Sequence, residues 1–230
     1  MGESLSTWTP SCNGAVRVEL SGQRTTSDSG ALLLREALDN SGVIEALEDN
    51  LVDRRHPLRI RHSLASQLRT LVLQRAMGWI DLSDTDTLRR DPLWQLACSD
   101  ARGMTPLVQD RPSQATLSRL LTCLGRCDNI DAVHEGLLRL VIWRLTALKN
   151  GERPKQLTLD IDGLPIEVHG HQGGSAYHGL YGARIYSPLV ASLAETGDMV
   201  GGLLREGNAG PAENADTWIP HLVRRLNEST

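Results

Sequence analysis

The sequence has 230 residues, of which 40% are hydrophobic and 23% charged, an ordinary composition for a globular protein. Its 28 acidic and 24 basic side chains give a formal net charge of −4, so no overall positive field indicates a nucleic-acid partner. Any such partner must be bound by a local patch. Nearly all the basic charge is arginine, since Lys149 and Lys155 are the only lysines. Arginine is better suited than lysine to bidentate phosphate contacts.

Two further features bear on the compartment. No apolar run approaches the length of a membrane span, and residues 1–12 lack the basic and apolar segments of a signal peptide. The four cysteines do not form a disulfide framework in a chain of this length, which favours a reducing cytoplasm.

The cysteines also raise the question of a zinc site, which Cys98, Cys123, Cys127 and His134 could form. Cys123 and Cys127 are four residues apart, so we expect them to share one face of a helix. Structural zinc pairs usually lie in short loops, and we therefore favour buried core thiols.

The first half of the chain predicts a series of helices. Residues 1–26 are polar, with a short strand-like run at 16–20. Ser27 or Asp28 is expected to cap the first helix, and Gly78 to end the third. The third helix carries an apolar stripe of Leu64, Leu68, Leu71 and Val72. The predicted helices span residues 30–38, 43–51, 64–77, 114–124 and 130–148.

The densest basic stretch of the sequence runs from residue 53 to residue 62, directly before the third helix. One interpretation is an ordinary solvated helix start. The other is contact with the phosphates of DNA, whose backbone charge arginine neutralises. The candidate DNA-binding residues are Arg54, Arg55, Arg59, Arg61, Arg69 and Arg75.

The pattern changes at residues 150–154, which have the composition of a linker. From Gln156 to Asp162 apolar and polar residues alternate strictly, which predicts a half-buried strand with Leu157, Leu159 and Ile161 on one face. After it we expect a Gly- and His-rich loop over residues 163–182 and a strand over 184–193 that is interrupted by Pro188. A hairpin turn at 195–198, another strand over 199–205 and a helix over 213–227 follow.

Several stretches together resemble the IS1380 family of insertion-sequence transposases, within the IS4-like group. The resemblance covers roughly residues 27 to 227 and rests on five stretches in the same order. The first three are residues 27–36, 77–92 and 114–120, and the fifth is residues 204–208. The fourth is discontinuous and consists of Leu159–Asp162, Val168–Gln172, Tyr177 and Tyr186–Leu189.

The resemblance implies a DDE transposase, in which three acidic side chains hold divalent metal on an RNase H-like sheet. It implies two regions. Residues 1–150 form an α-helical DNA-binding or assembly region, and residues 151–230 form the first part of an α/β RNase H-like domain. The first catalytic Asp maps onto Asp162, followed by Gly163, and Asp160 is its neighbour on the same face. Magnesium is the implied cofactor, because it prefers hard oxygen ligands.

The same resemblance implies the partners. These are DNA, at the terminal inverted repeats of an insertion sequence, and further copies of the chain in a homo-oligomer. The implied location is the bacterial cytoplasm near the nucleoid and not a membrane. Taken without the resemblance, Asp160 and Asp162 fit a solvated strand face better than a catalytic site. The histidines at 169, 171 and 178 match the family's loop near the active site, although they could also be drawn as a metal cluster.

In the family, the second Asp and the Glu lie on later elements than any in this sequence. We therefore expect an RNase H-like domain that is incomplete at its C-terminus and a truncated protein that is inactive alone. Three alternatives remain open: a non-catalytic DNA-binding repressor, a decayed remnant of the transposase, and a metal-dependent nuclease on the same fold.

Overall fold

The computed structural model describes residues 7–19, 28–101, 103–104, 111–148 and 156–229. Contacts divide the chain into two compact units, Met1–Gly136 and Leu137–Thr230, and the division falls inside helix α7. The predicted linker at residues 150–154 lies outside the described residues, so the domain limits 1–150 and 151–230 remain predictions. In the described part of the chain, no helix is long and apolar enough to cross a membrane.

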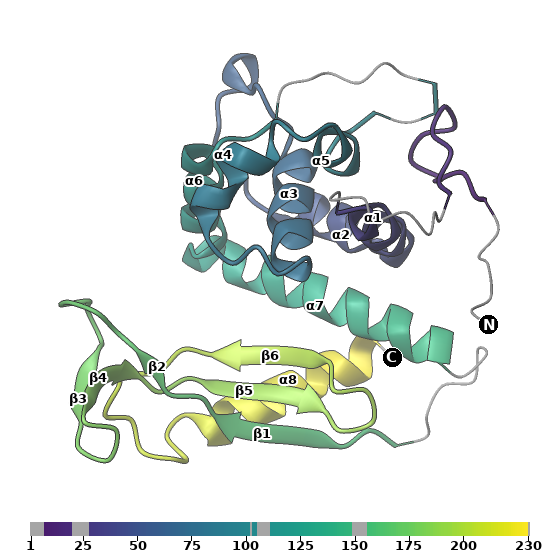
Figure 1. The fold of residues 1–230 in the computed structure, drawn as a ribbon. Coiled ribbons are helices and arrows are strands. Elements are labelled where there is room, and N and C mark those ends of the chain that lie inside the picture. The colour runs from purple at the N-terminus through teal and green to yellow at the C-terminus, as the bar shows by residue number, and fades with distance from the viewer. Residues whose placement is uncertain (1–6, 20–27, 102, 105–110, 149–155, 230) are drawn as a thin grey trace, which may run out of the picture. The chain divides into compact units, whose positions relative to one another are not determined.

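The first unit is helical in its described residues apart from an isolated bridge between Trp8 and Val18, where the sequence predicted a short strand (Figure 1). Its core is aliphatic, with Ile44, Leu68, Leu73 and Leu117 among the most deeply buried side chains. The helices and 3-10 turns are α1 (Gly30–Ser41), α2 (Val43–Asn50), η1 (Pro57–Arg59), α3 (Leu64–Ala76), η2 (Leu82–Asp84), α4 (Thr85–Leu88), α5 (Pro92–Ala97), α6 (Gln114–Leu124) and α7 (Cys127–Leu148).

The start of α1 differs from the prediction. Ser29 occupies the N-cap position and makes no side-chain capping bond. Asp28 does not cap the helix with its carboxylate, because Oδ2 accepts hydrogen bonds from two indole N–H groups, those of Trp79 at 3.1 Å and Trp94 at 3.0 Å. The other predicted cap, Ser27, lies outside the described residues. The acid of this stretch therefore ties the beginning of α1 to segments about fifty residues later in the chain.

Helix α3 lies in the interior of the first unit rather than on its surface. Leu68 is buried as expected, but Val72 is 38% exposed, and Leu73, which the predicted stripe left out, is buried instead. Polar side chains are also buried on the same helix. These polar groups have partners: Ser66 Oγ donates to the Cys98 carbonyl, and Gln74 accepts from the Thr85 hydroxyl at 2.8 Å. A single apolar stripe therefore describes α3 incompletely. Gly78, with φ +89°, follows its end as predicted.

The second unit contains two antiparallel three-stranded sheets and a C-terminal helix, α8 (Ala215–Ser229). The larger sheet has the order β1-β5-β6, and the smaller one has the order β2-β4-β3. The strands are β1 (Leu159–Gly163), β2 (Ile166–Glu167), β3 (Ala176–His178), β4 (Ala183–Tyr186), β5 (Leu189–Leu193) and β6 (Met199–Leu203).

The larger sheet confirms the predicted alternation. Leu157, Leu159 and Ile161 pack against a core that includes Leu193 and Val200, the second half of α7 and helix α8. Helix α8 runs along one face of this sheet (Figure 1). Strand β1 pairs with β5 on one side and is an edge strand of the sheet within the described chain.

The smaller sheet corrects the prediction of a loop over residues 163–182, since β2 and β3 both lie in this segment. Both strands are too short for their alternation to be visible in the sequence. The interruption expected at Pro188 is real, because the predicted strand 184–193 is split into β4 in the smaller sheet and β5 in the larger one.

Two residues of the stretch 204–208 attach this smaller sheet to the loop before α8. The guanidinium of Arg205, 5% exposed, donates to the carbonyls of Ser187 (2.8 Å) and Gly210 (2.8 Å). Gly207 lies so close to the sheet that an added Cβ would be 2.0 Å from the Ile185 carbonyl oxygen and 2.7 Å from the Ala176 nitrogen. Only glycine fits at this point without movement of the backbone.

Gly207→Ala should therefore destabilise the second unit by about 1–3 kcal/mol or more, the range for overpacked sites. The contacted atoms belong to backbone and cannot rotate away, so β3 and β4 must shift. Amide hydrogen exchange in β3 and β4 measures the loss of protection. Gly179→Ala is the matched control, because a Cβ at Gly179 meets nothing within 4 Å. Equal protection in the two variants would contradict the close packing at Gly207.

Candidate functional site

The open face of β1 carries the two acids that the sequence singled out. Asp160 and Asp162 are both exposed, while Leu159 and Ile161 point to the core. In register, Asp160 is opposite Ser192 and Asp162 is opposite Val190 on β5. The two carboxylates are two residues apart on one face, which corresponds to about 7 Å along a strand. They therefore face the same volume of solvent.

These carboxylates fit a divalent metal as part of a ligand set. Each offers hard oxygen donors, which Mg²⁺ prefers. Asp162 Oδ1 accepts a hydrogen bond from the Gly163 N–H at 2.8 Å, and a Cβ at Gly163 would meet nothing within 4 Å, so the space beside Asp162 is open. Among the described residues there is no group of three or more metal-binding side chains. Asp160 and Asp162 are thus two donors of a site that needs more.

The other predicted metal-binding candidates do not come together within the described chain. His169 and His171 are exposed in the loop after β2, and the His178 ring lies 4.9 Å from the Tyr181 ring. The prediction that Cys123 and Cys127 share a helix is wrong: Cys123 lies in α6, whereas Cys127 begins α7 after the break at Gly125.

The cysteines differ in burial as well. Cys127 is exposed and Cys123 half-buried, so neither is the fully buried thiol we expected. Cys98 is fully buried, and this burial raises the pKa of its thiol to about 11.

The predicted basic stretch lines a cavity of about 590 Å³ in the first unit. Arg54, Arg55, Arg59 and Arg61 all contribute to its wall, together with Asp53. Arg59 and Arg61 are exposed, and the side chain of Arg54 is 62% exposed. The sequence thus identified one wall of a cationic cavity.

Acids at the rim hold some of these arginines in place. Asp53 accepts from Arg55 Nε (2.9 Å) and Nη2 (2.6 Å), and these hydrogen bonds lower the pKa of Asp53. Asp128 accepts from Arg54 (2.5 Å) and Arg126 (3.1 Å). Desolvation opposes the ionisation of Asp128, but the two arginines outweigh it and lower its pKa. Both acids therefore remain ionised at neutral pH.

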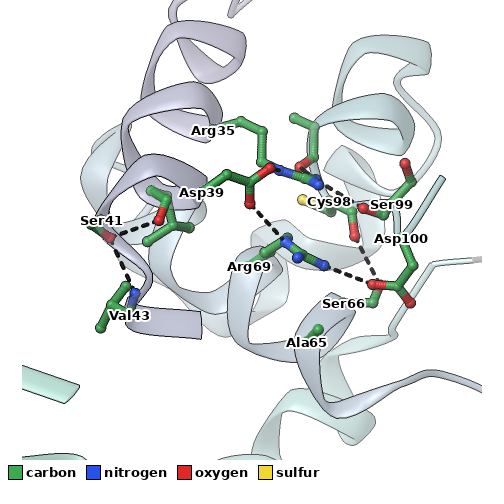
Figure 2. Close-up of polar contacts among 12 residues, drawn as sticks. Arg35, Asp39, Ser41, Val43, Ala65, Ser66, Arg69, Cys98, Ser99 and Asp100 are labelled. Carbon is green, nitrogen blue, oxygen red and sulfur yellow. Dashed lines mark hydrogen bonds and ion pairs between the residues drawn. The ribbon is translucent and has the colours of Figure 1, made fainter. Parts of the chain in front are cut away.

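Arg69 does not lie in this cavity wall. It is 3% exposed, and it forms ion pairs with Asp39 (3.3 Å) and with Asp100 (2.7 Å) (Figure 2). Arg35, fully buried, approaches the same Asp39 from the other side at 2.6 Å and donates to the Ala97 carbonyl. In this conformation Arg69 is part of a buried charge network, so we assign it a structural role and leave it out of the candidate DNA interface.

Arg75 is exposed near the end of α3 and is not among the cavity-lining residues. The cavity instead has four arginines that the sequence analysis did not select, Arg89, Arg111, Arg119 and Arg126. They are spread over thirty-eight positions of the chain and form no local basic run, so only the fold reveals that they belong to the same site.

Comparison with known proteins gives one match. The family model described as "Transposase DDE domain group 1" matches residues 9–230, almost the whole chain. No curated protein matches significantly. No solved structure does so either. With acids exposed on the edge strand of the larger sheet and a family match that includes both units, the chain belongs to the DDE transposase family of group 1.

Proposed function

We propose that this chain works in DNA transposition as part of an IS1380-type DDE transposase, and that β1, β5, β6 and α8 are the first elements of an RNase H-like catalytic domain. The observation that carries the proposal is the pair Asp160 and Asp162 on the open face of β1, at the edge of an antiparallel three-stranded sheet followed by a helix. Family membership supports transposition at a general level.

The edge position of β1 supports the RNase H-like assignment. In that fold the first strand is central, with the second and third strands on one side and two later strands on the other. Here β5 and β6 occupy one side of β1, and the other edge is unpaired within the described residues. We propose that later strands of a longer transposase pair with this edge. A free edge of this kind is prone to association until it is covered.

In this proposal Asp162 is a metal ligand and catalytic residue, and Asp160 assists it from the same face. The family generally uses divalent metal ions, and Mg²⁺ is the ion we propose. When bound, such ions activate the attacking oxygen and stabilise the leaving one in phosphodiester cleavage. The chain's own part is to hold carboxylate oxygens at fixed positions on a rigid strand. Carboxylates of the later strands would complete the ligand set, so residues 1–230 alone are proposed to be inactive.

The proposed DNA partner is the terminal inverted repeat of an insertion sequence, held by more than one copy of the chain. Arg54, Arg55, Arg59 and Arg61 are the proposed phosphate contacts, because all four line one concave surface. Arg75, exposed nearby in the sequence, is proposed as an outlying contact. Transposases bind DNA, and phosphate contacts dominate the affinity of such proteins and make it salt-dependent.

Replacing Arg54, Arg55, Arg59 and Arg61 together with alanine should flatten the dependence of log K on log salt. Each lost phosphate contact on duplex DNA reduces the slope by about 0.9, so the full change is up to about 3.6. Fluorescence anisotropy with a terminal-repeat duplex over a salt series measures it. The control removes the same charge by replacing four exposed arginines elsewhere, Arg17, Arg90, Arg139 and Arg224. An unchanged slope in the first variant would rule out the predicted interface.

A further inference from the structure

The cavity in the first unit is more basic than the predicted stretch alone accounts for. Among the described residues, eight arginines line it against one acid, Asp53. Half of the eight come from the segment between α2 and α3. Of the other half, Arg89 follows α4 and Arg111 lies in the segment before α6. Arg119 lies in α6, and Arg126 lies in the turn into α7.

We infer that this cavity is a phosphate-binding site that takes neighbouring phosphodiester groups of one DNA strand, and that Arg89, Arg111, Arg119 and Arg126 bind them together with the predicted stretch. This inference rests on the proposed function for the identity of DNA as the partner. Its chemical basis, recognition of an anion with several phosphates, stands on the cavity itself.

The size of the cavity favours contact with one strand at a time, including one strand of a duplex. Its volume, about 590 Å³, is in the range of small-ligand pockets, roughly 300–1,000 Å³. A duplex presents its two backbones on a wide convex surface, which a cavity of this size cannot enclose. A single backbone can enter it and meet arginines on several sides, as a flat patch would not allow.

The lining also indicates what is recognised on that strand. The lining residues that the structure describes include neither Trp nor Tyr, side chains that stack on bases in proteins that bind single strands. Ser113 and Thr116 add hydroxyl groups beside the arginines. Guanidinium groups and hydroxyls are donors that suit phosphate oxygens. The site therefore recognises the backbone and not the sequence of bases.

Burial strengthens the attraction of one lining arginine, Arg111, for an anion. Arg111 is 6% exposed and lines the cavity. A buried guanidinium attracts an anion more strongly than an exposed one, because water screens it less. Around it, Arg119 is exposed in α6, and Arg89 is partly exposed with Asp86 at 3.7 Å. Arg126 shares Asp128 with Arg54, so the two walls meet at one carboxylate.

The first test uses tripolyphosphate as a probe, measured by isothermal titration calorimetry on the full chain, and a single-stranded oligonucleotide measured by anisotropy. We expect both to bind and to compete. Arg89→Gln and Arg119→Gln should weaken both, and each should reduce the salt slope for the single strand by about 0.7. Arg90→Gln, the exposed neighbour of Arg89 outside the cavity, should change neither. Equal losses in Arg90→Gln, or no losses in the cavity variants, would overturn the inference.

A variant that is expected to tighten phosphate binding separates a loss of the site from misfolding. Asp128→Asn removes the negative charge shared by Arg54 and Arg126, so phosphate binding should become tighter, by about threefold for a unit charge at about 6 Å in water-like screening. A damaged fold would weaken binding instead. Weaker or unchanged binding with an unaltered melting temperature would contradict the site.

The rate at which Cys123 is alkylated tests the site without any substitution of an arginine. Cys123 lines the cavity, Cys127 is exposed, and Cys12 and Cys98 are buried. In a Cys127→Ser variant, tripolyphosphate should slow the alkylation of Cys123, and an unchanged rate would contradict binding in the cavity. Tripolyphosphate binding without competition by DNA would overturn the assignment to a DNA strand. Intact phosphate binding in a chain whose Asp160 and Asp162 bind no Mn²⁺ would count against the proposed function alone.

Discussion

Asp39→Ala should lower the free energy of unfolding of the first unit by about 3–5 kcal/mol, the range for breaking a buried ion pair from one side. Asp39 Oδ2 accepts from Arg35 Nε at 2.6 Å, and Oδ1 accepts from Arg69 Nε at 3.3 Å. Both guanidinium groups are almost fully buried. Without Asp39, Arg35 retains the carbonyls of Ala97 and Ser99, and Arg69 retains the half-exposed Asp100.

Urea unfolding followed by tryptophan fluorescence measures this change, because Trp94 is 2% exposed in the same unit. Asp49→Ala is the control, since Asp49 is exposed near the end of α2. It should alter stability by no more than about 0.5 kcal/mol, as surface substitutions usually do. Equal midpoints for the Asp39 and Asp49 variants would show that the network of Figure 2 contributes little.

The elements that the sequence predicted well are those with a strong local period. Strand β1 and the inward direction of Leu157, Leu159 and Ile161 follow from strict alternation over seven residues. The split at Pro188 follows from the missing N–H of proline, which cannot take part in a central ladder.

The elements that it missed depend on distant partners. Strands β2 and β3 are two and three residues long, too short for any period to be read. Asp28 was expected to cap α1, but the indoles of Trp79 and Trp94 compete for its carboxylate, and nothing near Asp28 in the sequence indicates this. Arg69 resembles a surface cation in sequence, and only the position of Asp39 explains its burial.

The same reason explains how much of the candidate site could be foreseen. Arg54, Arg55, Arg59 and Arg61 stand out because they are close together in the chain. Arg89, Arg111 and Arg119 reach the same cavity from separate elements, and a single sequence carries no signal for that convergence. Several motif positions that resemble the family are structural: Arg35 and Asp28 hold the first unit together, and Arg205 holds the loop before α8.

Asp162→Asn is expected to have the largest effect on metal binding of any change in the second unit. The amide keeps the shape of the side chain but removes the charge that attracts a divalent cation. We expect the affinity for Mn²⁺, used in place of Mg²⁺, to fall at least about tenfold. Asp160→Asn should have a smaller effect, because Asp160 is the assisting residue of the pair. Asp49→Asn, in the first unit, is the control for loss of one surface charge.

The most direct test of the account is paramagnetic broadening of amide resonances during a Mn²⁺ titration of the full chain. The account predicts broadening centred on β1 around Asp162 and on Val190, its partner in β5, retained in Asp49→Asn and lost in Asp162→Asn. Broadening centred away from β1, or broadening around β1 that survives in Asp162→Asn, would contradict the assignment of Asp162 as a metal-binding residue of a DDE transposase.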